Sequence, residues 1–222
     1  MNNLIEIKNL YKNYETIKRV NVLKKINFNF KKGKIYSLVG PSGSGKSTLL
    51  NLLSLIDKPS SGSIKISNFN INFSKNSEND VLRAKKIGLI YQDKNLLSDF
   101  NALENVYLAR LALQNNKTQA IEDAKDLIKK LGLLNRIEHF PSELSGGEKQ
   151  RIAIARALIN SPEIILADEP TGNLDTENSN MISKILFSYV KEEGSSLIMV
   201  THDLKLANRS TRKIKIKDGK IK

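Results

Sequence analysis

Hydrophobic and polar residues follow two strand-like patterns along this chain. Near the N-terminus they alternate, in IEIKNL (residues 5–10) and in LKKINFNFKKGK (residues 23–34), as they do in half-buried antiparallel strands. Further along, short apolar runs end abruptly in polar residues. These runs are KIYSLVG (34–40), KIGLIYQ (86–92), EIILADEP (163–170) and SLIMVTHD (196–203). Fully buried parallel strands have this composition, and ligands gather where such strands end.

Helical patterns occupy the segments between these strands. The run KSTLLNLLSLID (46–57) follows a Gly/Ser-rich turn and has the apolar spacing of a helix. After Asp93 the buried-strand pattern disappears, and a helix is predicted to end at Gly132. The residues on one face of that helix are Ile121, Ala124, Ile128 and Leu131. A helical lobe is therefore predicted in the middle of the chain.

The order of these elements predicts one α/β domain over residues 1–222. The α/β core would consist of about residues 1–92 and 156–222, with an antiparallel β subdomain near the N-terminus. A helical subdomain over about residues 93–155 would be inserted into this core. The tail RKIKIKDGKIK (212–222) predicts a closing hairpin around its Asp-Gly pair.

A phosphate-binding motif follows the first apolar run. GPSGSGKST matches G-x-x-x-x-G-K-[ST], with a predicted strand before it and a predicted helix after it. Glycines let backbone N–H groups turn toward phosphate oxygens, and the helix presents its positive end to the same anion. Lys46 can reach the β- and γ-phosphates, and the Ser47 hydroxyl can bind Mg²⁺. The candidate nucleotide-binding residues are Gly40, Pro41, Ser42, Gly43, Ser44, Gly45, Lys46, Ser47 and Thr48.

Three other apolar runs end in polar residues that would face the same crevice. Asp168 is placed to bind Mg²⁺, and Glu169 beside it can orient or deprotonate a water that attacks the γ-phosphate. Gln92 can contact the metal or that water, and His202 can hydrogen-bond the γ-phosphate. Each of these residues alone also has a purely structural interpretation. Together with the P-loop they predict an ATP-cleaving site, with Glu169, His202 and Gln92 as the catalytic candidates.

A second turn of small residues lies far from the P-loop in the sequence. In SELSGGEKQR (142–151), Ser145 and Glu148 have the spacing of a capping box, so a helix is predicted to begin there. Gly146 and Gly147 make this helix start a ready anion site. One nucleotide does not need two helix starts from the same chain. We therefore predict that the turn closes the nucleotide site of a second copy, in a two-fold dimer with composite sites.

The amino-acid composition excludes several classes of protein but does not indicate a function. The 222 residues are 40% hydrophobic, and they contain neither a signal-peptide pattern nor a run near the roughly 20 apolar residues of a membrane span. The absence of cysteine excludes disulfides, thiol catalysis and cysteine metal sites, and fits a cytoplasmic protein. The net charge of +13 fits an anionic partner, but the lysines are scattered, which favours compositional bias.

With these motifs the chain resembles the nucleotide-binding subunit of ABC transporters over essentially its whole length. The matching segments, in the family's order, are GPSGSGKST (Walker A), YQDKNLL (Q-loop), LSGGEKQR (signature), ILADEP (Walker B), GNLD (D-loop) and THD (H-loop). The resemblance implies a P-loop NTPase (RecA-like) core, ATP and Mg²⁺ as cofactors, and a dimer in which the Walker A motif of one subunit faces the signature of the other. It also implies that Tyr14, rather than Tyr11, stacks on adenine, and that Asp175 links the two sites.

Three longer segments resemble the LolD branch of this family, the ATPases of lipoprotein-releasing complexes. They are IYQDKNLLSDFNALENVYL, PSELSGGEKQRIAIARALINSPEIILADEPTGNLD and THDLKLANRSTRKIKIKDGKI. Ser98 stands where LolD-like chains usually have proline, and the MacB and FtsE branches share PTGNLD. The branch implies two membrane subunits of the LolC/LolE kind as partners, and the cytoplasmic face of the inner membrane as the location. MacB-like efflux or mechanotransmission and FtsE-like cell division are the alternatives.

Two further hypotheses concern partners. The apolar residues Leu96, Leu97, Phe100 and Leu103 either form a groove for a cytoplasmic helix of a membrane subunit or belong to the internal core. The second hypothesis follows from the net charge of +13, which would fit an ABC ATPase that acts on DNA or ribosomes. Members of that class usually carry a long coiled-coil insertion or two ATPase domains, and this chain has neither. We therefore expect no nucleic-acid partner.

Overall fold

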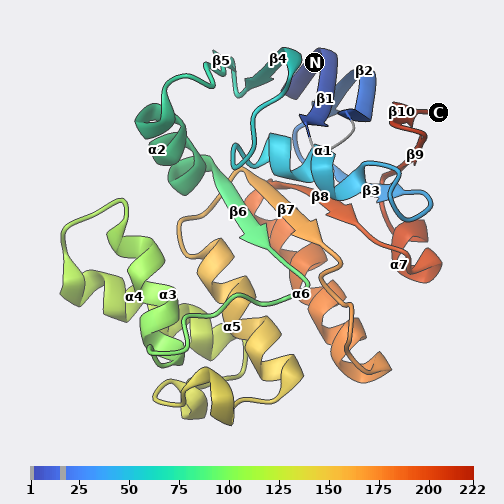
Figure 1. Cartoon of the computed structure of the whole chain (residues 1–222). Coiled ribbons are helices and arrows are strands. Elements are labelled where there is room, and N and C mark those ends of the chain that lie inside the picture. Colours follow the sequence, from blue (N-terminus) through green and yellow to red (C-terminus); the bar gives the residue numbers. More distant parts are fainter. Residues whose placement is uncertain (1–2, 16–18) are drawn as a thin grey trace.

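A six-stranded sheet runs through the middle of the molecule and contains the four predicted parallel strands (Figure 1). The computed structural model describes residues 3–15 and 19–222. Within these residues the strand order is β10-β9-β3-β8-β7-β6, and the pairs from β9 to β6 are parallel. The strands are β3 (Ile35–Val39), β6 (Ile87–Ile90), β7 (Ile164–Asp168), β8 (Ser196–Val200), β9 (Arg212–Lys217) and β10 (Lys220–Ile221).

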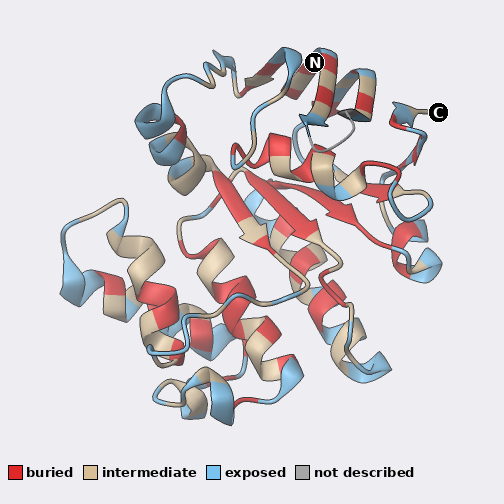
Figure 2. Cartoon of the chain, viewed as in Figure 1, coloured by how far each residue is buried: buried red, intermediate tan, exposed pale blue. Residues whose placement is uncertain are grey.

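Burial of the central strands explains their continuous apolar runs (Figure 2). Every residue of β8 is buried, and in β7 only the last residue, Asp168, is partly exposed. Ile165 of β7 pairs with Leu197 of β8 on one side and with Gly88 of β6 on the other. Because these strands are parallel, their carboxyl ends share one edge of the sheet, and the polar residues after them meet there.

A four-stranded antiparallel sheet lies at the N-terminal side, in the order β2-β1-β4-β5. Its strands are β1 (Asn3–Glu15), β2 (Arg19–Lys31), β4 (Ser61–Ile66) and β5 (Phe69–Asn70). The alternating segments near the N-terminus lie in β1 and β2, which confirms the predicted antiparallel strands. The strands β4 and β5 were not predicted, because only Ile64 and Ile66 are buried there and two positions are too few for a pattern.

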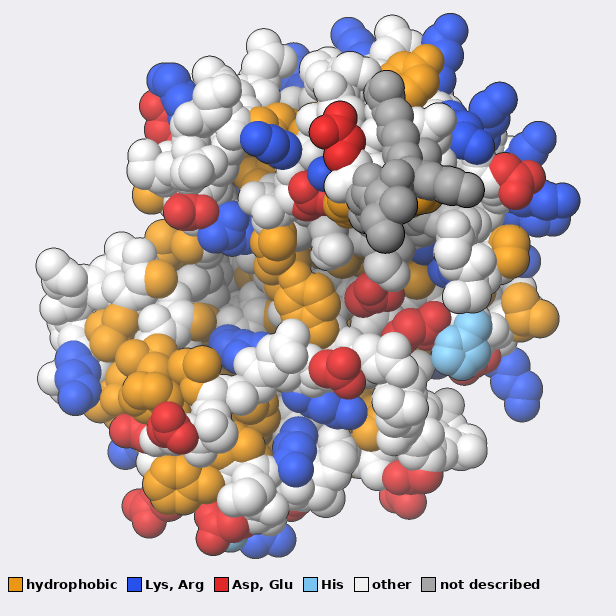
Figure 3. Space-filling model, viewed as in Figure 1, with side chains coloured by type: hydrophobic (Ala, Val, Ile, Leu, Met, Phe, Trp, Pro, Cys, Tyr) orange, Lys and Arg blue, Asp and Glu red, His pale blue; other side chains and the backbone are white. Residues whose placement is uncertain are grey.

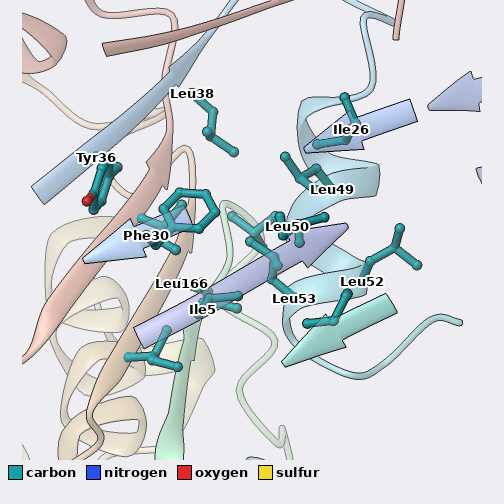
Figure 4. Close-up of a cluster of buried hydrophobic side chains, with 14 of the residues drawn as sticks. Ile5, Ile26, Phe30, Tyr36, Leu38, Leu49, Leu50, Leu52, Leu53 and Leu166 are labelled. Carbon is teal, nitrogen blue, oxygen red and sulfur yellow. The ribbon is translucent and has the colours of Figure 1, made fainter. Parts of the chain in front are cut away.

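Helix α1 (Lys46–Leu53) shares one hydrophobic cluster with strands of both sheets (Figure 4). Four leucines of α1 are buried in it, and each contributes about 1.5–3 kcal/mol of burial free energy. The rings of Phe30 and Tyr36 meet edge to face in the same cluster, with centroids 4.9 Å apart. The cluster therefore fixes α1, the helix that directly follows the P-loop.

The predicted helical region contains three helices and two short 3-10 turns. They are α3 (Ala102–Leu111), α4 (Lys117–Lys130), η1 (Leu134–Arg136), η2 (Pro141–Glu143) and α5 (Gly146–Leu158). On α4, Ala124 and Ile128 are fully buried and Ile121 is partly buried, as predicted. Gly132 stands just after this helix with φ +73°, the left-handed conformation that ends many helices.

Helix α5 joins the helical region to the central sheet. Its residues continue through the proposed boundary near residue 156, and Gly88 of β6 packs against the backbone of Ala157. One hydrophobic cluster contains residues of α3, α4 and α5 together with Ile165 and Leu197 of the sheet. The division into a core and a helical subdomain remains a prediction.

The four apolar residues predicted to form a groove separate into two pairs. Leu97 and Phe100 are 47% and 38% exposed, whereas Leu96 and Leu103 pack against the hydrophobic cluster of the helical region. The partly buried Leu96 and Leu103 therefore fit the internal-core interpretation, and a groove that includes Leu97 and Phe100 stays a prediction.

Two element boundaries differ from the sequence prediction. The helix predicted over residues 46–57 ends at Leu53, and Leu55 has φ +61°. The strand predicted from Lys86 begins one residue later, because Lys86 is the last residue of α2 (Asn76–Lys86). This helix was missed since Asn79 is the one buried residue in it, so it has no apolar periodicity.

The remaining elements complete the fold at the C-terminal side. They are α6 (Thr176–Glu193) and α7 (Leu204–Asn208), followed by the hairpin of β9 and β10. Asp218 and Gly219 have φ values of +53° and +76° in the hairpin turn, which confirms its predicted position. Among the described residues, no helix combines the length and the apolar content that crossing a membrane requires.

Gly88→Ala should destabilise the protein, because α5 packs directly on this position. An added Cβ would overlap the carbonyl oxygen of Ala157 and lie 3.0 Å from Cγ of Pro162. We expect the free energy of unfolding, measured by urea denaturation, to fall by about 1–3 kcal/mol. Gly146→Ala is the control, since its Cβ would approach other atoms only to 3.8 Å. Equal stability of the two variants would contradict the close packing of α5 on β6.

Candidate active site

The P-loop has the backbone conformation of an anion-binding turn. Gly40, Gly43 and Gly45 have φ values of +152°, +72° and +102°, which favour glycine. A Cβ on Gly40 would overlap the carbonyl oxygen of Ile216, in β9. Gly45 is the N-cap of α1. A glycine-rich turn that leads into a helix N-terminus presents backbone N–H groups and a positive dipole end to an anion.

A cleft of about 590 Å³ lies beside the P-loop. It is lined by Val22, Gly40, Ser42, Gly43, Gly45, Lys46, Ser47, Thr48, Asp168, Glu169, Val200 and His202. The structure thus brings most of the predicted P-loop together with the residues that follow β7 and β8. Pro41 and Ser44 lie outside this lining, and Ser44 is buried.

The side chain of Lys46 folds back onto the backbone of the P-loop. Its ammonium group donates hydrogen bonds to the carbonyl oxygens of Gly40, at 3.0 Å, and of Pro41, at 2.9 Å. The charge therefore lies at the mouth of the loop, next to the helix N-terminus. Both features favour the phosphates of a nucleotide at this position.

Asp168 and Ser47 are two candidate oxygen ligands for a metal ion in the cleft. Both residues line the cleft, and the nearby Ser47 hydroxyl favours the ionised form of the Asp168 carboxylate. Burial raises the pKa of Asp168, and the charge of Glu169 raises it further, whereas Ser47 and Lys46 act in the opposite direction. The described residues contain no group of three or more His, Cys, Asp or Glu side chains that could hold a metal ion. One carboxylate and one hydroxyl suit Mg²⁺, which takes its other ligands from phosphates and water.

Glu169 and His202 contact each other across the ends of β7 and β8. The Oε2 atom of Glu169 lies 3.0 Å from Nδ1 of His202 and accepts a hydrogen bond from the His202 backbone N–H at 3.3 Å. Glu169 has φ +47°, and its own N–H donates to the Val200 carbonyl. This left-handed conformation ends the strand at Asp168.

Gln92 lies outside the cleft lining, in contrast to the other catalytic candidates. Its amide packs against Gly172, whose added Cβ would be 3.2 Å from Nε2 of Gln92. The N–H of Gly172 donates to the carbonyl of Glu169 at 2.9 Å. Gln92 therefore contacts the turn that follows Glu169. Its contact with a metal or an attacking water stays a prediction.

Tyr14 lies at the end of β1, beside the last residue of the P-loop. It is 38% exposed, its hydroxyl donates to Oδ2 of Asp57 at 2.8 Å, and the Thr48 side chain lies nearby. The Lys12 ammonium lies 4.5 Å from the ring centroid. Burial and the bond to Asp57 raise the pKa of Tyr14. Stacking of this ring on adenine remains a prediction, and Tyr14 does not itself line the cleft.

The second glycine turn forms the predicted helix start on α5. The Ser145 hydroxyl accepts from the Glu148 N–H at 3.3 Å, and the Glu148 carboxylate accepts from the Ser145 N–H at 2.8 Å. Arg136 also donates to Glu148, at 2.9 Å. The Ser145 N–H and the Arg136 guanidinium together lower the pKa of Glu148 to about 2. The described residues that line the P-loop cleft do not include Ser145, Gly146, Gly147 or Glu148.

Asp175 begins the helix that follows the turn after β7. Its side chain is the N-cap of α6 and accepts from the backbone N–H of Asn178 at 2.9 Å. This bond lowers the pKa of the exposed Asp175 carboxyl. The proposed link between two nucleotide sites through Asp175 stays a prediction.

Comparison with known protein families identifies the group to which the chain belongs. The sequence profile of ABC transporters matches residues 23–172. The chain belongs to the ABC transporter family. It is an ABC-type ATPase.

Relatives of this ABC ATPase match it over the full length. The lipoprotein-releasing system ATP-binding protein LolD of Rickettsia bellii is 42% identical over 99% of this chain and 98% of its own. LolD of Cytophaga hutchinsonii is 42% identical over 100% of both chains. A dimeric post-hydrolysis state of the ATP-binding cassette MJ0796, bound to ADP and Pi, superposes with a TM-score of 0.92 at 38% identity, covering 98% of this chain and 96% of that one.

Two residues of the ABC ATPase site gave no sequence signal. Val22 lines the cleft from β2, where it appears as one apolar position of an alternating strand. Arg136 holds Glu148 from η1, twelve residues before it and without helical or strand spacing. Only the three-dimensional packing brings these residues to the site.

Lys46→Ala should weaken ATP binding about 10- to 100-fold, because it removes the cation at the mouth of the P-loop. The dissociation constant can be measured by isothermal titration calorimetry. Lys34→Ala, at an exposed lysine, is the control and should bind within twofold of the unaltered protein. An unchanged affinity of Lys46→Ala would exclude a phosphate contact of this lysine.

Proposed function

We propose that this ABC ATPase powers a lipoprotein-releasing transporter and works as a two-fold dimer with composite ATP sites. The observation that carries the dimer is the separation of the P-loop cleft from the signature turn, which supplies none of the described lining residues. The start of α5 carries small residues that suit an anion. Because they lie outside the P-loop cleft of their own chain, the nucleotide that they bind would be held by another chain. The dimeric solved relative supports this pairing, and the full-length similarity to LolD proteins supports lipoprotein release.

ATP would bind with its phosphates in the P-loop and its adenine against Tyr14. Lys46 would contact the β- and γ-phosphates. Ser47 and Asp168 would hold Mg²⁺, with Gln92 as a further candidate ligand once the loop after β6 approaches. The lining of the cleft supports this, since it places two oxygen ligands, from Ser47 and Asp168, beside the P-loop.

Hydrolysis would depend on the carboxylate of Glu169. This group can orient or deprotonate a water on the γ-phosphate side of the cleft. When Nδ1–H of His202 donates to Glu169, the neutral imidazole keeps Nε2 as an acceptor, and the protonated imidazole has a donor there. His202 can therefore hold Glu169 in place and contact phosphate or water with its other nitrogen.

The membrane subunits, of the LolC/LolE kind, would dock in a second cleft. This cleft has a volume of about 640 Å³ and lies between α2, β6, α3 and α5 (Figure 3, the hollow left of centre). It is lined by Asp80, Val81, Arg83, Ala84, Ile87, Gly88, Leu89, Tyr91, Asn95, Ala109, Ala112, Arg156, Ala157 and Asn160. Apolar walls with two arginines suit an amphipathic cytoplasmic helix that carries an acidic residue.

Arg156 and Asn160 connect this second cleft to the ATPase site. Arg156, on α5, donates to the carbonyl oxygens of Lys94 and Asn95, at 2.8 and 2.6 Å, and thus holds the loop after Gln92. Asn160 donates to the carbonyls of Ala84, in α2, and Ala109, in α3. A helix seated here would contact both the Q-loop and the signature helix, and the chain would be held peripherally at the cytoplasmic face of the membrane.

Glu169→Gln should bind ATP and Mg²⁺ but stop cleaving ATP, so that ATP accumulates a closed dimer. Glutamine keeps the size of the side chain and removes its capacity to accept a proton. We expect steady-state ATPase activity to fall by at least about 10²-fold. Size-exclusion chromatography with and without ATP should show an ATP-dependent shift from monomer to dimer.

The matched control for this experiment adds Lys46→Ala to Glu169→Gln. The double variant should remain monomeric at an ATP concentration that just saturates Glu169→Gln, because its nucleotide binding is weaker. Normal turnover by Glu169→Gln would refute the role of this carboxylate. A monomer at saturating ATP would refute the composite site.

Val81→Asp should abolish assembly with the membrane subunits while leaving the ATP-dependent dimer intact. Val81 is 60% exposed in the second cleft, and a carboxylate there would repel an acidic helix and remove an apolar contact. Co-purification of tagged chain with LolC/LolE-type subunits measures the effect. Leu134→Asp, at a 45% exposed leucine of η1, is the control and should assemble normally. Equal assembly of both variants would place the docking site elsewhere.

A further inference from the structure

The two glycines of the signature turn have different surroundings within one chain. A Cβ on Gly146 would come no closer than 3.8 Å to its nearest neighbour, Cδ2 of Leu174. A Cβ on Gly147 would overlap the side-chain oxygen of Asn178 and lie 2.6 Å from its Cγ. Gly147 is itself buried. A contact within the same chain therefore explains the glycine at position 147, because a side chain there would collide with Asn178 of α6.

Asn178 is held rigidly in the first turn of α6. Its side-chain amide donates to Oδ2 of Asp175 at 2.6 Å, and its backbone N–H donates to Oδ1 of the same carboxylate at 2.9 Å. Asp175 is the N-cap of α6 and the last residue of the D-loop. The amide oxygen of Asn178 is thereby directed at Gly147. A second contact between the two helices follows one turn later, where Arg151 approaches Met181.

We propose that Asn178 is a positioning residue that fastens the signature turn to the D-loop of the same chain. The inference rests on the proposed composite site, in which both segments face the nucleotide of the second copy. With Asn178 between Gly147 and Asp175, the two segments approach that nucleotide as one body. Gly147 is glycine so that the amide can reach the backbone, and Gly146 remains the glycine open to the partner's phosphates.

The same contact continues toward the catalytic carboxylate. The D-loop follows directly from Glu169, through a turn in which the Gly172 N–H donates to the Glu169 carbonyl and the Leu174 N–H donates to the Thr171 carbonyl. A displacement of the signature turn is thus passed through Asn178 and Asp175 to the loop that begins at Glu169. Engagement of the partner's ATP by one chain would in this way position that chain's own carboxylate.

Thermal unfolding of the isolated chain tests the contact itself. Gly147→Ala should lower Tm by roughly 4–8 °C, because the methyl group forces Asn178 away. In an Asn178→Ala background the same substitution should cost less than about 1 °C, since the obstruction is gone. Gly146→Ala is the matched control and should not lower Tm. Equal losses from Gly147→Ala in both backgrounds would overturn the contact.

Dimer formation tests the positioning role. In the Glu169→Gln background, Asn178→Ala should raise the ATP concentration for half-maximal dimerisation about tenfold. ATP affinity of the monomer, measured at low protein concentration with a fluorescent ATP analogue, should stay within twofold. Lys184→Ala, at an exposed position of the same helix, is the control and should change neither value.

The outcomes separate this inference from the proposed function. Normal dimerisation of Glu169→Gln with an unchanged titration for Asn178→Ala would overturn the positioning role alone. A parallel loss of monomer ATP affinity in Asn178→Ala would also overturn it, because the effect would then come from damage to the P-loop side. Failure of Glu169→Gln to dimerise at all would overturn the composite site, and the positioning role with it.

Discussion

Parallel pairing of β3, β8, β7 and β6 determines where the ATPase side chains lie. The strands are held together by backbone pairing and by buried apolar side chains. Each strand nevertheless delivers its next residues to the same edge. The P-loop, the Asp168–Glu169 pair and His202 therefore meet, although they come from three segments that are distant in sequence.

Three carboxylates of the chain show how surroundings assign different tasks to one chemical group. Asp168 is partly buried against Ser47, which suits a metal ligand. Glu169 follows it with a left-handed backbone and contacts His202, which suits a group that orients or deprotonates water. Glu148 is bound by the N–H of Ser145 and by Arg136, so it stays ionised and orders the start of α5. Neighbouring backbone geometry, more than residue type, separates these roles.

The sequence allowed prediction of those features whose chemistry is local. The P-loop, the capping box at Ser145 and the ends of the buried strands each combine a short motif with a strong apolar pattern, and all three lie in the predicted elements. Helix α2 and strands β4 and β5 escaped prediction because they bury too few side chains for a periodic pattern. The contact between Gly147 and Asn178 was also out of reach, since it joins two helices and depends on a distance that no spacing in the sequence encodes.

Close packing of Gly40 against the Ile216 carbonyl has a consequence for how the protein is made. The strand β9 pairs in parallel with β3 and its Ile216 carbonyl lies against Gly40 of the P-loop, although β9 is synthesised long after that loop. A ribosome therefore exposes the glycine turn long before the backbone that supports it has been translated. Nucleotide cannot stabilise the growing chain through a finished pocket, and the site acquires its final shape only when this distant, late contact forms.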